Sequence, residues 1–268
     1  MPAATQLLIV KPQNDFCDVH CAALPVPGAN ADLQRLAAVV DRCGDRIGRI
    51  QVMLEFRHQL NISHACWWQD AAGQPPAPFT VITRDDVLHK RWYARDPALQ
   101  ALALAYVCAL EQRGRYPLLV RPEHCLIGSW GASMQMDLHG ALNRWCHRTL
   151  RSVSYAPIGL NQGTEHYSAL QAEVPDLGDP RTMANDSLLT SLATAEHLII
   201  AGQSLSHGLA ATVYDIAALL GPSAVRKITL LTDCTSPMAG FEEMGKRFLA
   251  DLVGRGMRVA KSTELQLV

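Results

Sequence analysis

The sequence has no excess of charge of either sign, since 24 basic and 25 acidic residues leave a formal net charge of -1. Such a balance gives no basic surface for nucleic acid or an anionic membrane. Long apolar runs are also missing: none approaches the roughly 20 residues that cross a bilayer, and no basic segment with an apolar signal core opens the chain. The eight cysteines include no zinc-type CxxC pair. We therefore expect a cytoplasmic protein with free thiols, no cofactor, and small molecules or proteins as partners.

What the sequence does have is enough apolar material for one large core, with 268 residues of which 49% are hydrophobic. Short apolar runs alternate with longer segments whose apolar residues recur three and four positions apart. Because right-handed crossovers lay helices over both faces of a parallel sheet, this alternation predicts a three-layer α/β/α fold. The expected strands are Gln6–Val10, Arg49–Leu54, Pro117–Val120, Ser152–Ala156, His197–Ala201, Lys227–Leu231 and Met257–Ala260; the expected helices are Ala31–Cys43, Pro97–Arg113, Ser133–Leu150, Leu188–Ala195, Leu209–Leu220 and Phe241–Arg255.

We predict a single domain over residues 1–268 with an excursion at about 66–97. That excursion is too long for an ordinary connection, so it is expected to cover the site or form an interface. Its tryptophans, Trp67, Trp68 and Trp92, are expected to cover core.

The residues that follow the predicted strands carry a resemblance. They form the segments QNDFC with LPVPGA, ISHACWWQD, RPEHCLIGSWGA, NQGTEHYSAL, AGQSLSHGLAATVYDIA and LLTDCTSPMAGFEE, in this order. This series resembles the isochorismatase-like cysteine hydrolases, the superfamily of nicotinamidase. The resemblance implies a six-stranded, mainly parallel sheet in the order 3-2-1-4-5-6. Ligands of such sheets bind at the carboxyl ends of the strands.

The positions of the catalytic groups that this resemblance implies hold residues of other chemistry. The family uses a cysteine thiolate at a helix start, an aspartate that takes the thiol proton, and a lysine that stabilises charge. The aspartate position is Lys11 here, the lysine position is Ile158 and the cysteine position is Gly208. A protonated lysine has no lone pair with which to accept a proton. We therefore predict that the hydrolysis typical of the family is lost.

The metal site that the resemblance implies for the nicotinamidase branch is also altered. Its positions are occupied by Glu55, Arg57, Asn61 and His124. An arginine stays protonated and repels a metal cation. Glu55 and His124 are thus weak candidates for metal ligands, and we predict no metal. His58 and His64 lie nearby in the sequence and leave an altered site open.

A lysine at the end of a buried strand needs a partner, because a buried unpaired charge costs several kcal/mol. We predict that Lys11 pairs with Glu55 or Asp15. Asn14 and Asp15 have a structural role available as turn residues that bond the backbone. The segment Glu165, His166 and Tyr167 is expected to hold a loop or an interface.

Other nucleophiles lie near the predicted site. Cys125 is the nearest thiol, although a free cysteine usually packs as a small apolar residue. Ser204 lies in a Gly-x-Ser turn similar to the nucleophile elbow of α/β-hydrolases, but no histidine follows His207 to complete a triad in that order. Ser206 is expected to cap the helix that follows. The resemblance implies a cis peptide bond in this turn, by position between Ser204 and Leu205.

The start of that helix is expected to favour an anion. Free N–H groups at Gly208 and Leu209, with the positive end of the helix dipole behind them, attract negative charge. Lys11 and Arg57 reinforce this preference. A carboxylate or phosphate is thus a more plausible ligand than an amide that undergoes hydrolysis.

The leading hypothesis is a catalytically degenerate isochorismatase-like protein that binds a small anionic ligand or a protein partner. A homo-oligomer or a mixed oligomer with an active relative is expected. The alternative is a hydrolase of an amide, ester or vinyl-ether bond with a nucleophile outside the family pattern. A third hypothesis, a structural subunit, predicts a cleft filled by side chains such as Trp67 or Arg57. The predicted ligand-binding residues are Lys11, Glu55, Arg57, Asn61, His124, Ser204, Leu205 and Gly208; the fallback catalytic candidates are Cys125, Ser204, Ser206 and His124.

Overall fold

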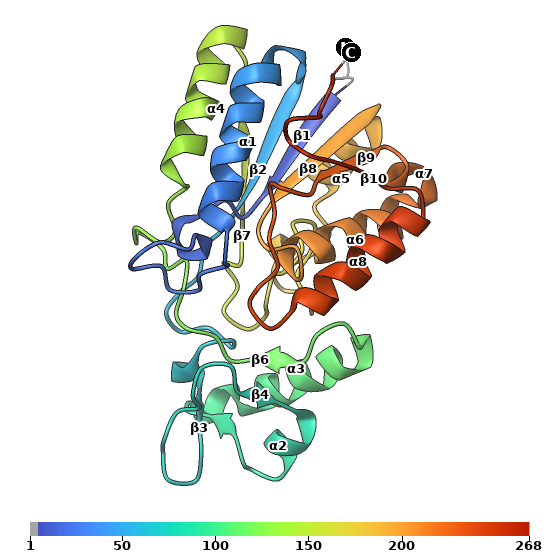
Figure 1. Ribbon diagram of the computed structural model, residues 1–268. Coiled ribbons are helices and arrows are strands. Elements are labelled where there is room, and N and C mark those ends of the chain that lie inside the picture. The colour runs from blue at the N-terminus through green and yellow to red at the C-terminus, as the bar shows by residue number, and fades with distance from the viewer. Residues whose placement is uncertain (1–4, 268) are drawn as a thin grey trace.

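The computed structural model describes residues 5–267, which form a layered α/β body with a smaller lobe beside it (Figure 1). Six strands form one sheet in which all neighbouring strands are parallel, in the order β10-β9-β8-β1-β2-β7. Read from β7 and numbered along the chain, this is the order 3-2-1-4-5-6. The predicted fold class is therefore confirmed. The strands are β1 (Thr5–Val10), β2 (Arg49–Glu55), β7 (Ser154–Ile158), β8 (His197–Gly202), β9 (Ile228–Leu231) and β10 (Arg258–Ala260).

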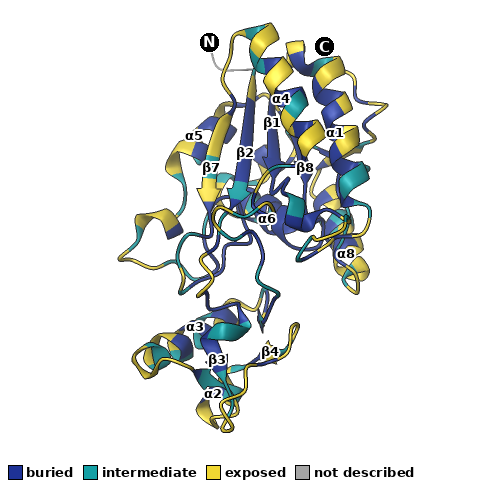
Figure 2. Cartoon of the chain, turned by 90° about the vertical axis from the view of Figure 1, so that its left-hand side faces the viewer, coloured by how far each residue is buried: buried dark blue, intermediate teal, exposed yellow. Residues whose placement is uncertain are grey.

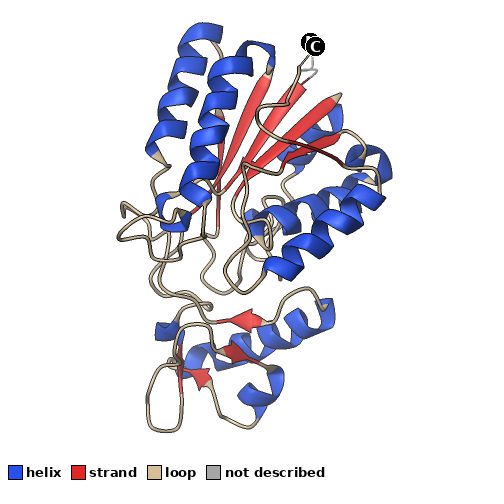
Figure 3. Ribbon diagram, in the orientation of Figure 1, coloured by secondary structure: helices blue, strands red, loops and turns tan. Residues whose placement is uncertain are grey.

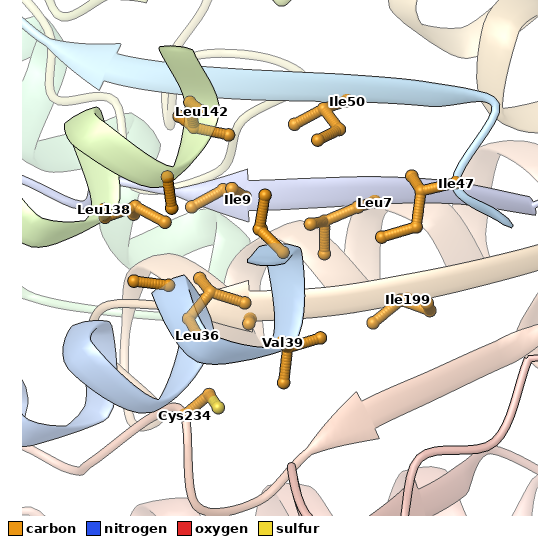
Figure 4. Close-up of a cluster of buried hydrophobic side chains, with 14 of the residues drawn as sticks. Leu7, Ile9, Leu36, Val39, Ile47, Ile50, Leu138, Leu142, Ile199 and Cys234 are labelled. Atoms are coloured by element: carbon orange, nitrogen blue, oxygen red, sulfur yellow. The ribbon is translucent and has the colours of Figure 1, made fainter. Parts of the chain in front are cut away.

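Helices cover both faces of this sheet (Figure 3). On one face lie α1 (Ala29–Cys43) and α4 (Met136–Thr149), and on the other lie α5 (Asp186–Thr194), α6 (Gly208–Leu220), α7 (Pro222–Val225) and α8 (Glu242–Gly254). The side chains of a strand alternate between faces, which explains the continuous apolar run in β1. Leu7 and Ile9 join the apolar cluster with α1 and α4 (Figure 4), whereas Leu8 and Val10 join the cluster with α6 and α8.

The smaller lobe is built by the chain between β2 and α4 and has a hydrophobic cluster of its own, in which Trp67 and Trp68 are buried and Trp92 packs against them. The expected strand Pro117–Val120 belongs here and not to the main sheet, because Leu118–Leu119 pair antiparallel with Val81–Ile82. A short apolar run does not reveal its partner strand. We keep the single domain with an excursion as a prediction. The lobe contains β3 (Trp68–Gln69), β4 (Val81–Ile82), α2 (Arg84–Leu88), β5 (Tyr93–Ala94), α3 (Gln100–Arg113) and β6 (Leu118–Leu119).

Short 3-10 segments occupy several connections, at Asn14–Phe16, Gly44–Arg46, Ala65–Trp67, Pro97–Leu99 and Pro180–Thr182. Strand β7 forms one edge of the sheet, and much of its surface is exposed (Figure 2). Within residues 5–267, every helix is too short or too polar to cross a membrane.

Candidate functional site

The carboxyl ends of β1 and β2 bring two opposite charges together. Lys11 follows β1, and its Nζ lies 2.7 Å from Oε2 of Glu55, the last residue of β2. The same Nζ donates a hydrogen bond to the carbonyl oxygen of His166 at 2.8 Å. Lys11 is 4% exposed and Glu55 is fully buried. Of the two partners predicted for Lys11, the structure selects Glu55.

Gln13 fixes the backbone of Glu55 in this position. Its side-chain Oε1 accepts from the N–H of Glu55, and its Nε2 donates to the carbonyl oxygens of Glu55 and Ala132. Burial by itself raises the pKa of Glu55, but Arg57 and Lys11 together hold that pKa well below its usual range. Burial lowers the pKa of Lys11, which the Glu55 carboxylate opposes. Glu55 is therefore ionised and acts as the anion that two cations share.

Arg57 is the second cation on Glu55 and is itself 1% exposed. Its Nε donates to Oε1 of Glu55, and its Nη1 donates to Oδ1 of Asn61 at 3.0 Å and to Oγ of Ser63 at 2.9 Å. Four residues were predicted at the metal positions. Two of them, Glu55 and Asn61, are hydrogen-bonded to another of the four, Arg57. The fourth, His124, has its Nε2 3.4 Å from Oε1 of Glu55.

Two further buried residues extend this set of charges. Oε1 of Glu165 lies 3.9 Å from Nη2 of Arg57 and 3.7 Å from Nη1 of Arg121. Tyr167 donates to Oε2 of Glu165 at 3.1 Å and accepts from Arg121. We call Lys11, Glu55, Arg57, Arg121 and Glu165 the ionic cluster.

Glu165 was expected to hold a loop or an interface, and no role in the site was predicted for Arg121. Their place in the cluster follows from long-range folding, because isolated bridges hold Arg57 beside Leu126 and His64 beside Arg121. Arg121 directly follows the apolar run Leu118–Val120, and this is a signal that could have identified it; Glu165 follows the polar residues Asn161–Thr164 and carries no such signal.

Lys11 packs beside Gly208, the position that the resemblance assigns to the nucleophile. Residue 208 is a glycine at the start of α6, and a Cβ there would meet Cδ of Lys11 at 3.3 Å, Cε of Lys11 at 3.4 Å and the carbonyl oxygen of Gln203 at 2.9 Å. The methylene stem of the lysine therefore fills the space beside Gly208. Ile158, which the resemblance places at the third catalytic position, packs in the apolar cluster with α6 and α8.

The turn before α6 differs in several respects from the prediction. The cis peptide bond joins Gln203 and Ser204, one residue earlier than predicted. Ser206 does not cap the helix, because its Oγ accepts from the N–H of Met238 and contacts Nδ1 of His207. The N–H of Leu209 is not free, since it donates to the carbonyl oxygen of Ser204 at 3.1 Å. The expected anion site at this helix start has therefore lost one of its donors.

The remaining residues of the predicted site serve packing or turns. Leu205 packs in the apolar cluster with α8, beside Gly245. Ser204 is 6% exposed, and its carbonyl oxygen accepts from two N–H groups. Asp15 acts as a turn residue: Oδ1 accepts from the N–H of Ala23 and Oδ2 from the N–H of Cys125.

The fallback nucleophiles are poorly placed for attack. Cys125 is fully buried, and burial together with nearby Glu55 raises the pKa of its thiol well above the usual range. Ser206 is also fully buried, and its hydroxyl contacts His207, whose pKa burial lowers to about 3. No carboxylate is bonded to His207 among residues 5–267, so the pair lacks the third group of a triad.

The residues present do not fit a metal ion. Within residues 5–267, no three side chains of His, Cys, Asp or Glu are arranged to hold one. The Arg57 guanidinium instead bonds to two of the positions from which ligands are expected. His64, which the sequence left open, does lie close by: its ring centre is 5.7 Å from that of His124.

The strand order and the two helical layers give this chain the isochorismatase-like α/β fold. No family model matches the sequence, and no curated protein matches it. Solved structures do match. The yeast nicotinamidase superposes with a TM-score of 0.65 at 19% identity, over 96% of this chain and 99% of that one.

Two further solved structures superpose on nearly the whole chain. A nicotinamidase/pyrazinamidase of Acinetobacter baumanii gives a TM-score of 0.63 at 16% identity, over 98% of both chains. The pyrazinamidase of Pyrococcus horikoshii, in complex with zinc, gives 0.57 at 16% identity, over 96% of this chain and 99% of that one. The chain therefore shares the fold of these hydrolases along nearly its whole length.

Proposed function

We propose that this chain is a catalytically degenerate protein of the isochorismatase-like fold, which acts by binding and not by hydrolysis. The observation that carries the proposal is the position of Lys11. Its stem fills the space beside Gly208, and its ammonium group is paired with Glu55. A thiolate, its proton acceptor and a charge-stabilising lysine are all replaced, so the covalent route has no participant left.

The pairing of charges favours a protein over a small anion as the partner. Lys11 and Arg57 already contact Glu55, and Arg121 contacts Tyr167 and lies near Glu165. A small anion that enters the ionic cluster has to displace a buried carboxylate from its cations. Breaking such an ion pair is costly because the cluster is buried away from water.

An exposed apolar surface beside the sheet edge supports a protein partner. Ile127 and Trp130 are each 52% exposed and Tyr155 is 49% exposed. Beside them lies a hollow of about 790 Å³ whose lining includes Phe56 and Met134 and no formally charged side chain. Trp and Tyr are enriched where interfaces gain their binding energy.

We propose a second copy of this chain as the occupant of that surface. An uncharged surface meets its own copy across a twofold axis without like-charge repulsion. A mixed oligomer with an active relative is the alternative outcome. A reducing cytoplasmic location belongs to the same proposal, since all eight cysteines are free.

Turnover by the purified protein tests the degenerate site. The substrates are nicotinamide, isochorismate and a panel of activated esters and amides, and the matched variants are Cys125→Ala and Ser206→Ala. We expect the wild type and both variants to give the rate of the protein-free blank. Turnover by the wild type that disappears in one of the variants would establish the alternative hydrolase and refute the proposal.

A further inference from the structure

The smaller lobe contains a cavity that shares no residue with the ionic cluster. Its volume is about 630 Å³, and its walls come mainly from α2, α3 and the short strands β3 and β5 of the lobe (Figure 1). Cavities of roughly 300 to 1,000 Å³ with mainly apolar walls are the usual sites of small-molecule ligands. The size of this cavity therefore suits a small organic molecule.

The walls of the cavity are mainly apolar. Val87 on α2 and Ala94 on β5 line it, and each is only 2% exposed. Leu104 on α3 also lines it, and so does Leu88, which is 51% exposed. Water in contact with such walls is released when an apolar body covers them, which favours binding.

One charged side chain lines the cavity, that of Lys90. Among residues 5–267, no carboxylate forms an ion pair with it, because the acidic residues just before it in the chain have other partners. Asp86 pairs with Arg91 at 2.7 Å, and Asp85 lies 3.5 Å from Nε of Arg84. The ammonium group of Lys90 can therefore pair with an anion that enters the cavity.

The backbone of Lys90 has an unusual conformation for a lysine. Its φ angle of 56° lies in the left-handed region, just after the end of α2. Glycine or asparagine is usual at such a position, because a Cβ is strained there. Residues held in strained conformations concentrate at functional sites such as ligand sites. A lysine is retained here at a conformational cost, which points to a role for its side chain.

We propose that this cavity binds a small apolar molecule with one carboxylate, which pairs with Lys90 while the apolar body covers Val87 and Leu104. A single lysine suits one negative charge, whereas a phosphate carries about two and accepts several strong hydrogen bonds. Gln100, which also lines the cavity, accepts from the N–H of Ala94 at 2.8 Å through Oε1, so its Nε2 remains a donor for the ligand. The site lies outside the ionic cluster, so the proposal holds whether or not the chain self-associates.

Isothermal titration calorimetry of the full chain with straight-chain carboxylates tests the proposal. The probes are acetate, butanoate, hexanoate, octanoate and decanoate, with decanol as the uncharged counterpart of decanoate. We expect one decanoate per chain and an affinity that rises about 3-fold with each added methylene group. Acetate should give no binding heat, and decanol should bind more weakly than decanoate.

Substitutions at exposed positions locate the site without a risk to folding. Lys90→Gln should weaken decanoate binding about 5-fold or more, because the charge that meets the carboxylate is lost, and should leave decanol binding unchanged. Lys261→Gln, at an exposed lysine of the main body, is the matched control. Leu88→Glu, which places a like charge beside the carboxylate, should weaken decanoate binding about 10-fold. Its control, Leu219→Glu on α6, should bind as the wild type does.

Three results would overturn the proposal. The first is no binding heat with decanoate at millimolar concentration. The second is an affinity that does not rise with chain length, since the apolar walls would then take no part. The third is a decanoate affinity that Lys90→Gln and Leu88→Glu change no more than their controls do, which would place the bound carboxylate elsewhere on the protein.

Discussion

The apolar cluster beneath α1 and α4 and the ionic cluster at the strand ends are both buried, yet they are held together in different ways. In the first, Leu7, Ile9 and Leu36 contact many apolar neighbours, so each contributes in proportion to the surface it removes from water. In the second, Glu55 is shared by Lys11 and Arg57, so one carboxylate determines whether two buried cations are tolerated. The comparison teaches that the loss of one side chain from the apolar cluster removes only its own contacts, whereas the loss of one charge from the ionic cluster also affects the charges paired with it.

Removing the shared charge should have the largest effect. Glu55→Gln leaves Lys11 and Arg57 buried without their anion, so we expect it to lower the free energy of unfolding by about 3 to 5 kcal/mol. Ile9→Val, a matched change in the apolar cluster, should cost about 0.5 to 1.5 kcal/mol. Urea denaturation of both variants checks this. Equal losses in the two variants would show that the ionic cluster adds no collective effect.

The apolar part of the molecule could be predicted from the sequence because its signal is local. The alternation of Leu7 and Ile9 with Leu8 and Val10 already marks a strand covered on both faces. The ionic cluster could be predicted only in part. Glu55 was predicted as one of two possible partners of Lys11, the other being Asp15, whereas Arg121 and Glu165 join through contacts between residues far apart in the chain. The spacing of residues along the sequence does not indicate such contacts.

The position of the cis peptide and the role of Ser206 were missed for a related reason. Resemblance transfers a turn only to within about one residue, and here the cis bond falls at Gln203–Ser204. The hydroxyl of Ser206 binds the N–H of Met238, a residue that follows a different strand.

The second largest effect is expected from acid, which should lower stability through buried histidines near the ionic cluster and not through the apolar cluster. Burial, with Lys11 beside His166 and Arg121 near His207, lowers the pKa of each of these histidines to about 3. Below about pH 6.5 the unfolded chain protonates these histidines, whereas the native chain does not. Their contribution to the free energy of unfolding is therefore complete above about pH 6.5 and is lost as the pH falls toward 3. Each histidine accounts for a loss of up to about 1.4 kcal/mol per pH unit. Glu173 acts in the opposite sense, since burial raises its pKa to about 7.

Urea denaturation at several pH values between 7.5 and 5 checks this prediction. His166→Asn should flatten the loss of stability on acidification, whereas Ile9→Val should keep the wild-type slope. A His166→Asn protein with the full wild-type slope would contradict the assignment of the acid sensitivity to this histidine.

Filling the space beside α6 should have a smaller effect. A Cβ at residue 208 meets Lys11 and the carbonyl oxygen of Gln203, so we expect Gly208→Ala to cost about 1 to 3 kcal/mol. Gly254, near the end of α8, has open space around it, and Gly254→Ala should be neutral or stabilise the protein by up to about 1 kcal/mol. Thermal unfolding compares the two. A neutral Gly208→Ala would show that Lys11 does not fill this space.

The smallest effect on stability is expected at the exposed surface. Trp130→Glu should change the free energy of unfolding by less than about 0.5 kcal/mol, because the residue is half exposed. It should nevertheless convert a dimer to a monomer in light scattering, since a charge is placed in the proposed interface. Leu219→Glu, an exposed position on α6, is the matched control. A wild type that is monomeric at high concentration would refute self-association through this surface.

The most direct test of the central claim is a high-resolution crystal structure of the wild-type protein grown with zinc and nicotinamide. We predict density that places Nζ of Lys11 at ion-pair distance from one oxygen of the Glu55 carboxylate and the Arg57 guanidinium at the other oxygen. We predict neither zinc nor nicotinamide at the strand ends. Zinc bound by Glu55 and the histidines, or nicotinamide beside Gly208 with Lys11 turned away, would contradict the claim.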